Sequence, residues 1–457
     1  MDKNKDFLGT EPIGRLMFRL AVPSVIAQLV NLLYNMVDRI YIGKYDPTGL
    51  AITGVGICLP IITMISAFAA LVGYGGSPQA SILLGRQETE KAERTMGNCL
   101  TCLLAAGLAL TVILLFSAHG ILMRFGASAD TIGYATDYIR IYLLGTVSVQ
   151  LALGMNSFIS AQGFTTASMI SVLIGAALNI VLDPVFIFAL DMGVRGAALA
   201  TVISQTVSAI WVIGFLCSKK AVMRIRHENL KLSGKIILPC LALGLSPFVM
   251  QFTESILNIC FNTSLQKYGG DIAVGSITVL TTIMQFCLLP LSGFTQGAQP
   301  VTSYNFGAGK YDRVRKSFRL LIITCMSYSL LLWLMIELFP GAFIRLFNNG
   351  NPELVSYASR MLRLFCCVLF LMGAQIACQQ TLIAVGNAKT SIFLAILRKI
   401  ILLIPFIYIF PCFVSENAAK AVAVFCAEPA ADFAAVTTTV ILFSKQFKKA
   451  LRGNTEA

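Results

Sequence analysis

The most regular feature of the chain is a series of long apolar runs separated by short polar segments. A helix that crosses a membrane needs about 20 mostly apolar residues, and runs of that length recur from one end of the chain to the other. They lie near residues 16–43, 50–75, 96–117, 131–153, 165–189, 194–217, 235–264, 272–297, 318–338, 356–379, 389–411 and 418–443. This pattern predicts an all-α membrane protein with twelve transmembrane helices.

The composition agrees with a membrane protein and decides how the charge is interpreted. Of the 457 residues, 56% are hydrophobic and 12% are charged, whereas soluble domains carry about 25% charged residues. The net charge of +13 would suit a nucleic-acid partner. The basic residues gather in short loops between apolar runs, however, as residues that set membrane orientation do. We therefore expect a lipid bilayer around the chain and no nucleic acid.

The distribution of lysine and arginine predicts the orientation in the membrane. If the N-terminus is cytoplasmic, most basic residues fall in cytoplasmic segments, as the positive-inside rule requires. The opposite side receives only Lys44, Arg124, Arg195, Lys267, Arg345 and Lys420. The polar start, Met1 to Thr10, has no pattern of a cleaved signal peptide. We expect a multi-pass protein of the inner (plasma) membrane with both termini in the cytoplasm.

Sequence motifs repeat at a nearly constant distance along the chain. The segment from Pro78 to Gly85 recurs 222 residues later as Pro300 to Gly307, with proline, serine and glycine at the same places. The segment Tyr134 to Arg140 recurs 223 residues later, from Tyr357. At the same spacing Gln28 pairs with Gln251, Asn35 with Asn258 and Gly163 with Gly386. The chain is therefore expected to consist of two similar halves.

Six spans per repeat give both halves the same orientation in the membrane. Their pseudo-twofold axis then runs along the membrane normal, and two such six-helix bundles enclose a central cleft. We expect an N-terminal bundle at 1–217, a cytoplasmic linker at 218–235 and a C-terminal bundle at 236–457. Rocking of one bundle against the other exposes the cleft to alternate sides, which suits a carrier that works as a monomer.

Ionisable groups inside transmembrane helices are costly and mark candidate functional sites. Five acids lie well inside the predicted spans, namely Asp38, Asp183, Glu254, Glu428 and Asp432. Asp38, Asp183 and Glu254 reach similar depths at a rise of 1.5 Å per residue, and Asn179 lies one helical turn from Asp183. With Thr201, these residues form a candidate site for cation or proton coupling, at which Asp38 and Asp183 are candidate ligands for Na⁺.

Polar residues and prolines complete the candidate site. Five amides are candidates for lining the substrate cleft, namely Gln28, Asn31, Asn35, Gln251 and Asn258. Prolines free the carbonyl four residues before them, so that kinks at Pro23, Pro184 and Pro247 are candidate hinges or cation ligands. Simpler structural roles remain open for each of these residues. Asp38 could lie at the solvated end of its helix, and Asp183 could be a helix cap at the membrane interface. The other three acids could be neutral or paired structural carboxyls, and the prolines could be tolerated kinks.

A buried carboxylate can bind a proton, a sodium ion or an organic cation, but only one at a time. That competition is a simple physical route to exchange across a membrane. Motifs of nucleotide binding, zinc proteolysis and dinucleotide binding are absent, and the thirteen cysteines lie mostly in apolar runs as expected for buried thiols. Any transport is then powered by an ion gradient or by a partner protein, and we expect no cofactor apart from a coupling H⁺ or Na⁺ and no enzymatic activity.

Several of these segments together resemble the multidrug and toxic compound extrusion (MATE) family over essentially the whole chain. They are Pro23 to Gln28 with Asn35 to Asp38, Ala161 to Gly163, Leu178 to Pro184, and Gly297 to Gly307. The resemblance implies that Asp38, Asn179, Asp183 and Thr201 form the amino-half cation site. Glu254 matches an acid of one branch. That branch also has an aspartate in the tenth span, and 356–379 contains no acid.

The resemblance implies a secondary antiporter that exchanges H⁺ or Na⁺ for lipophilic, often cationic compounds. One alternative is a flippase for lipid-linked oligosaccharides, in the same superfamily. Such a flippase would favour a basic cleft, whereas arginines such as Arg140, Arg363 and Arg398 are few beside the five acids. A less favoured alternative is a channel, which would conduct ions instead of showing saturable counterflow. We expect small amphipathic cations as cargo.

Overall fold

The computed structural model describes residues 6–347 and 352–452, and this part of the chain is helical with no strands. The elements of the first half are α1 (Phe7–Thr10), α2 (Ile13–Tyr45), α3 (Leu50–Gly85), α4 (Thr89–Arg124), α5 (Ile132–Leu144), α6 (Thr146–Gln150), η1 (Leu151–Met155), α7 (Asn156–Ala161), α8 (Thr165–Pro184), η2 (Val185–Ala189) and α9 (Val194–Cys217). Those that follow are η3 (His227–Asn229), α10 (Gly234–Gly307), α11 (Tyr311–Leu338), α12 (Pro340–Phe347), α13 (Pro352–Phe365), α14 (Leu369–Ala384), α15 (Ala388–Ile396), η4 (Leu397–Leu403), α16 (Ile404–Ile409), η5 (Phe410–Phe413) and α17 (Asn417–Arg452).

The number of spans agrees with the sequence prediction. Within the described residues, nine helices are long and apolar enough to cross a membrane, and two bent pairs raise the number to 11. One of the nine, α10, has 74 residues and contains non-helical backbone at Gly270 (φ 62°, ψ −160°). Only glycine adopts such a conformation readily, and the chain can reverse there. Counting α10 as two spans gives twelve, and the predicted fold class is confirmed.

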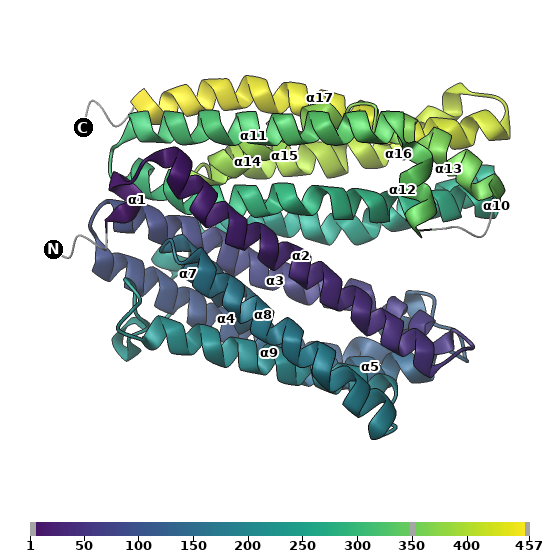
Figure 1. The fold of residues 1–457 in the computed structure, drawn as a ribbon, viewed down its shortest axis with the longest axis horizontal. Helices are drawn as coiled ribbons and strands as arrows, with labels where there is room; N and C mark the ends of the chain where they lie inside the picture. Colours follow the sequence, from purple (N-terminus) through teal and green to yellow (C-terminus); the bar gives the residue numbers. More distant parts are fainter. Residues whose placement is uncertain (1–5, 348–351, 453–457) are drawn as a thin grey trace.

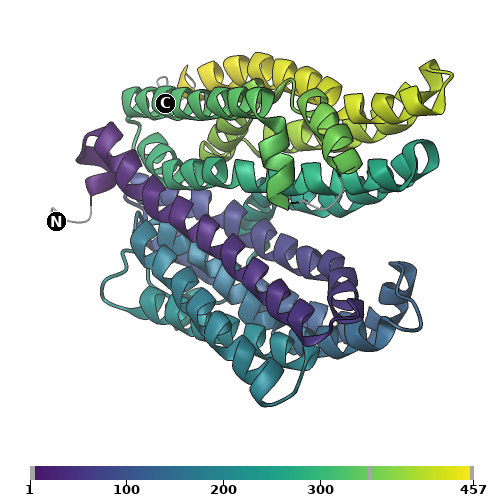
Figure 2. The same ribbon diagram turned by 45° about the vertical axis from the view of Figure 1, so that its right-hand side comes forward.

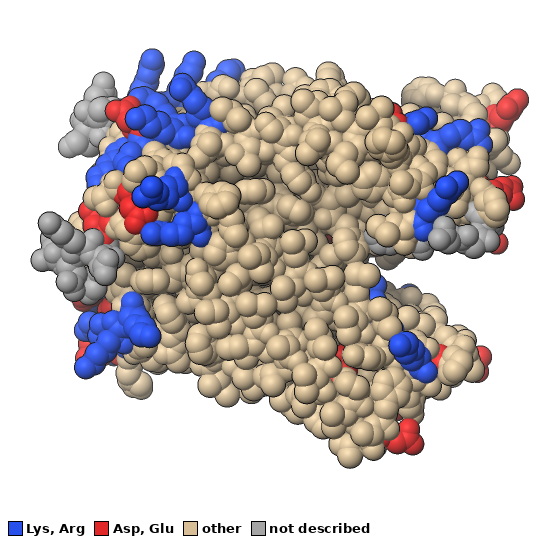
Figure 3. Space-filling view, viewed as in Figure 1, with Lys and Arg blue, Asp and Glu red and all other residues tan. Residues whose placement is uncertain are grey.

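The helices form two bundles that lie side by side. Helices α2 to α9 form the lower bundle of Figure 1, and α10 to α17 form the upper one. Both described ends of the chain lie at the same end of the molecule, which we call the basic end because lysine and arginine gather there in Figure 3. Between the two ends the surface is almost free of charge, and it exposes large apolar residues such as Phe116 (89% exposed). Lipid is the solvent that suits this belt.

Equivalent contacts recur in the two bundles, as the sequence repeat predicts. The Ser81 hydroxyl donates to the Ala161 carbonyl (2.7 Å), and the Ser303 hydroxyl donates to the Ala384 carbonyl (2.8 Å). The fourth span bends by 62° between α5 and α6, and the tenth bends by 50° between α13 and α14. The repeated glycines, 163 and 386, have φ of 86° and 81°, a region that side chains disfavour. The two halves thus share local structure as well as sequence.

Close backbone approaches join the two halves and follow the same pseudo-symmetry. At each of these places, a Cβ added to a glycine would collide with the backbone of the other half. The contacts are Gly85 with Tyr304, Gly307 with Ile82, Gly75 with Gly244, and Gly297 with Ala21. The first two pairs are related by the sequence repeat, and so are the last two. Glycine is needed here because only it allows backbones to come this near.

A short segment at the basic end, residues 6–11, contacts both bundles. We call it the clasp. Its Leu8 and Glu11 carbonyls accept hydrogen bonds from Arg313 (3.2 and 2.7 Å). On the other side Phe7 packs against Phe164 of the amino half, with ring centroids 6.4 Å apart. The clasp therefore holds the halves together at this end, whereas Figure 3 shows a notch between them at the opposite end.

The linker between the halves is anchored to the amino bundle. The Glu93 side chain on α4 is only 5% exposed and pairs with Arg226 of the linker at 2.9 Å. The Gln162 side-chain oxygen accepts hydrogen bonds from the backbone amides of Val222 (2.7 Å) and Met223 (2.8 Å). Figure 2 shows this loop lying against the amino bundle at the basic end.

Candidate functional site

Two carboxylates lie near each other inside the amino bundle. Asp38 lies in the last two turns of α2, and Asp183 lies at the end of α8, immediately before Pro184 and the π-helical turn η2. Asp183 is fully buried, and Asp38 is close enough for its charge to act on Asp183. Among the described residues, neither carboxylate forms an ion pair. This is the pair that the sequence places at similar depth.

Asn179 links Asp183 to the next helix. Its side-chain amide donates to the Asp183 carboxylate (3.2 Å) and to the Thr201 hydroxyl (3.3 Å) on α9. The spacing of one turn brings Asn179 and Asp183 together, while the packing of α8 against α9 brings Thr201. The structure therefore gathers the four residues Asp38, Asn179, Asp183 and Thr201 at one place.

Three oxygen atoms at this place are buried and have no hydrogen-bond donor. They are Asp38 Oδ1, Asn179 Oδ1 and Asp183 Oδ2. Buried polar atoms are nearly always paired, so each exception calls for an explanation. All three atoms are acceptors, so a proton on a carboxylate, a cation with oxygen ligands or a water molecule would satisfy them.

The fit to a metal ion depends on neutral ligands. No group of three or more histidine, cysteine or acidic residues that could hold a metal occurs in the described part of the chain. A sodium ion between Asp38 and Asp183 would therefore take its other ligands from Asn179 or Thr201. A proton would need no further ligand.

A tyrosine also belongs to this site, although the sequence prediction omitted it. Tyr138 on α5 is 4% exposed and lies near Thr201 of α9 and Asp38 of α2. It lies in the repeated motif that begins at Tyr134, but the repeat identifies related positions and does not show which of them face a site. Tyr138 places a hydroxyl group, which can donate and accept, next to the unpaired acceptors.

A polar cavity of about 140 Å³ lies deeper in the same bundle. Gln28, Asn31, Tyr34 and Gln205 contribute to its wall, and apart from tyrosines its lining contains no ionisable side chain. Gln296 of α10 closes it from the other half, where it accepts a hydrogen bond from the Gln28 amide (3.1 Å). The cavity thus reaches the interface between the bundles, and Asp38, Asp183, Asn179 and Thr201 do not line it.

The remaining amides and prolines lie in different surroundings. Asn35 donates to the Asn31 carbonyl (2.6 Å), so part of its hydrogen-bonding capacity is used within α2. Gln251 and Asn258 lie on α10, and neither lines the polar cavity. The three prolines lie inside α2 (Pro23), at the end of α8 (Pro184) and inside α10 (Pro247). Their roles as cleft-lining residues and hinges stay predictions.

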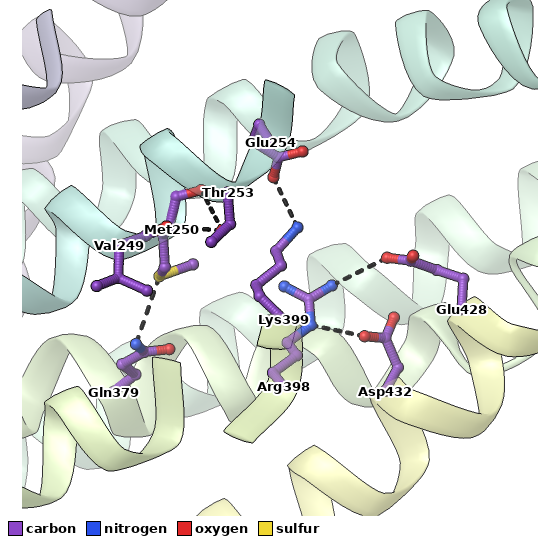
Figure 4. A network of polar contacts seen from close by, with 9 residues as sticks. All are labelled: Val249, Met250, Thr253, Glu254, Gln379, Arg398, Lys399, Glu428 and Asp432. Carbon is purple, nitrogen blue, oxygen red and sulfur yellow. Dashed lines mark hydrogen bonds and ion pairs between the residues drawn. The ribbon is translucent and has the colours of Figure 1, made fainter. Parts of the chain in front are cut away.

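Glu254 belongs to a second charged cluster, in the carboxyl bundle (Figure 4). Its carboxylate pairs with Lys399 at 2.7 Å, and the neighbouring Arg398 pairs with Asp432 (2.7 Å) and Glu428 (3.4 Å). Three of the five acids predicted to matter are therefore paired with two protein cations. The comparison of five acids with a few arginines overlooked Lys399, which lies within an apolar run and carries the same membrane cost as an acid.

An apolar pocket of about 380 Å³ lies between the halves, toward the end opposite the basic end. Met64 of α3, Phe125 directly after α4, and Phe252 and Ile259 of α10 help to line it. Flexible methionine and flat aromatic side chains adapt to ligands of different shapes. The structure thus combines an acidic site in one bundle with an apolar pocket at the interface, an arrangement that suits a membrane carrier.

Comparison with known proteins identifies the family of this carrier. The family model MatE matches residues 23–185 and 247–409, one segment in each half. The chain therefore belongs to the MatE family, and it is a transporter and not an enzyme. The resemblance to the MATE family is confirmed.

Individual relatives agree with this assignment. The multidrug export protein MepA of Staphylococcus haemolyticus (strain JCSC1435) is 26% identical over 408 residues, which cover 89% of each chain. MepA of Staphylococcus aureus (strain NCTC 8325 / PS 47) is 25% identical over 414 residues, again 89% of each chain.

Solved structures show the same fold. The MATE multidrug transporter DinF-BH, solved as a complex, is 33% identical, with a TM-score of 0.89 and 99% of each chain covered. An outward-facing conformation of a multidrug resistance MATE family transporter of the MOP superfamily is 24% identical and has a TM-score of 0.89, with 99% of each chain covered.

Proposed function

We propose that this transporter is a multidrug antiporter that exchanges inward-moving H⁺ or Na⁺ for lipophilic, often cationic compounds. The coupling cation binds at Asp38 and Asp183, with Asn179 and Thr201 as neutral partners. Support comes from the relatives, which are multidrug export proteins, and from the structural similarity to the multidrug transporter DinF-BH.

The observation that carries the proposal is the set of three buried acceptors without donors. Asp38, Asn179 and Asp183 each have one such oxygen. An unpaired buried acceptor costs about 1–3 kcal/mol, and a bound proton or sodium ion removes that cost. The same atoms release the ion when the site is hydrated or when a cationic compound takes its place.

Exchange follows from competition and from movement of the bundles. One positive species must leave the acidic pair before another binds, so that inward ion flow is linked to outward movement of cargo. A membrane potential contributes about 2.3 kcal/mol per charge per 100 mV, enough for more than tenfold accumulation. The cleft between the bundles exposes the cargo to either side as they rock.

The proposed orientation places the basic end, with both termini, in the cytoplasm of a cell with this protein in its inner (plasma) membrane. Lysine and arginine at that end in Figure 3 support it, because basic residues are retained on the cytoplasmic side. The notch at the opposite end then faces outward. A monomer contains the complete cleft and is the proposed working unit.

The experiment is dye counterflow in proteoliposomes that contain the purified protein. A sodium gradient and a pH gradient are imposed separately, and efflux of a lipophilic cationic dye is followed. We expect one of the gradients to drive efflux in the unmodified protein and no coupled efflux in Asp38→Asn. Gradient-driven efflux that persists in Asp38→Asn would remove Asp38 from the mechanism.

The same experiment separates the other functions considered. A flippase for lipid-linked oligosaccharides is not favoured by the relatives, and it would move such lipids without dye counterflow. A channel would give conductance on addition of ions and no saturation by dye. Failure of both gradients to move any dye would overturn the proposed antiport.

A further inference from the structure

The carboxyl bundle contains two consecutive basic residues that point into the protein. Arg398 and Lys399 lie in the π-helical turn η4, and only 9% and 5% of their surfaces are exposed. An insertion of this kind in a helix is rare and often marks a functional site. A lysine buried at membrane depth is stable only with a partner for its charge.

The two bases have separate partners on different helices, as Figure 4 shows. Arg398 is shared by Asp432 and Glu428, which lie one turn apart on α17. Lys399 extends to α10 and pairs with Glu254. Because Arg398 is occupied by two carboxylates, Lys399 is the cation that neutralises Glu254.

The two members of this pair differ in their exposure. The Lys399 side chain is 6% exposed, whereas the Glu254 side chain is 52% exposed. The carboxylate thus lies beside open space, and its counter-charge reaches it from inside the bundle. The carboxylates of the two halves therefore differ in whether a basic side chain pairs with them. Asp38 and Asp183 each have an unpaired oxygen and form no ion pair among the described residues, whereas the Glu254 carboxylate lies 2.7 Å from the ammonium of Lys399.

We propose that Lys399 is a built-in counter-cation, which occupies at Glu254 the place that a free cation would otherwise take. Glu254 then needs no free cation, and the proposed coupling site is the acidic pair of the amino half. This inference rests on the proposed function for its meaning in transport, but the charge pairing itself can be tested without transport.

The test replaces the tethered ammonium by a free one. Lys399→Ala removes the charge and leaves space for a small amine, and ethylammonium is the probe. In the purified full-length protein we expect ethylammonium to raise the melting temperature of Lys399→Ala and to restore its dye efflux. The unmodified protein should show neither effect.

The matched control is Lys399→Ala combined with Glu254→Gln, which removes both charges. We expect this double variant to bind ethylammonium at least about tenfold more weakly than Lys399→Ala, a difference of about 1.4 kcal/mol. An equal response of the two variants would overturn the proposal, as would efflux by Lys399→Ala that is normal without amine.

Folding is part of the same test. If Lys399→Ala alone cannot be purified, an isolated Glu254 charge is the proposed cause, and the double variant should fold. A double variant that is equally unfolded would show that Lys399 acts through packing, against the proposal. If the unmodified protein moves no dye, the proposed function fails, while the ethylammonium-dependent melting temperature still decides the role of Lys399.

Discussion

Asp183→Asn should make the protein more stable and at the same time inactive. Asp183 Oδ2 and Asn179 Oδ1 are buried acceptors without donors. An asparagine at 183 can still accept the hydrogen bond from the Asn179 amide through its oxygen, and its NH₂ group takes the place of the Oδ2 acceptor that has no donor. Sites built for function often carry such a cost in stability.

The size of the effect follows from those unpaired atoms. One unsatisfied buried acceptor costs about 1–3 kcal/mol, so satisfying one should stabilise the fold by about 2 kcal/mol. The entropy of unfolding is about 2.1 cal/mol/K per residue, which is about 1 kcal/mol/K for 457 residues. The melting temperature should therefore rise by about 2 °C.

The assay is thermal unfolding of the purified protein together with dye efflux in proteoliposomes. Asp130→Asn is the matched control, since Asp130 is exposed and lies outside the site. It should leave both measurements unchanged. A lower melting temperature for Asp183→Asn, or gradient-driven efflux that survives the change, would refute the assignment of Asp183 to a strained coupling site.

Three further changes test the packing around the cleft. Gly85→Ala places a Cβ against a backbone carbonyl of the other half and should destabilise the protein by about 1–3 kcal/mol in thermal unfolding. Gly120→Ala is the control, because a Cβ at Gly120 has no atom within 4 Å, and it should leave the melting temperature unchanged. Equal melting temperatures of the two variants would contradict the close approach of the backbones at Gly85. Arg313→Ala removes two hydrogen bonds to the clasp and should increase thiol labelling of a cysteine placed at the basic end. Arg315→Ala removes only an exposed ion pair with Asp312 and should leave thiol labelling unchanged. Equal labelling of the two variants would argue against the role of the clasp in holding the halves together. Glu93→Ala removes the buried ion-pair partner of Arg226 in the linker and should lower the free energy of unfolding by about 2 kcal/mol. It should also speed proteolysis of the linker, and unchanged proteolysis would show that other contacts hold the linker.

Much of the architecture could be predicted from the apolar pattern. The run at 194–217 corresponds to α9, Val194–Cys217, and the run at 165–189 corresponds to α8 with η2. This agreement has a physical cause: in lipid every backbone amide must be paired within its own segment. The length and composition of a span are then local properties that a sequence displays directly.

The candidate site was predicted in part for the same reason. Asn179 and Asp183 are one turn apart on a single helix, so their hydrogen bond follows from helical geometry. Tyr138 was missed because its place beside Thr201 depends on how α5 and α9 rotate against each other. Lys399 is not part of the sequence prediction, because that prediction rests on the acids within the spans.

The twelve spans, the internal repeat and the types of polar group within the bilayer can be predicted from the amino-acid sequence, because each depends on local composition or spacing. Which of these groups are paired depends on how the helices pack in three dimensions. Glu254 meets Lys399 across 145 residues, and Gln28 meets Gln296 across 268. Such pairs are set by helix rotation and by the glycine contacts between the halves, where a single methyl group changes the distance between backbones. For that reason one half retains unpaired carboxylate oxygens and the other holds its own counter-cation.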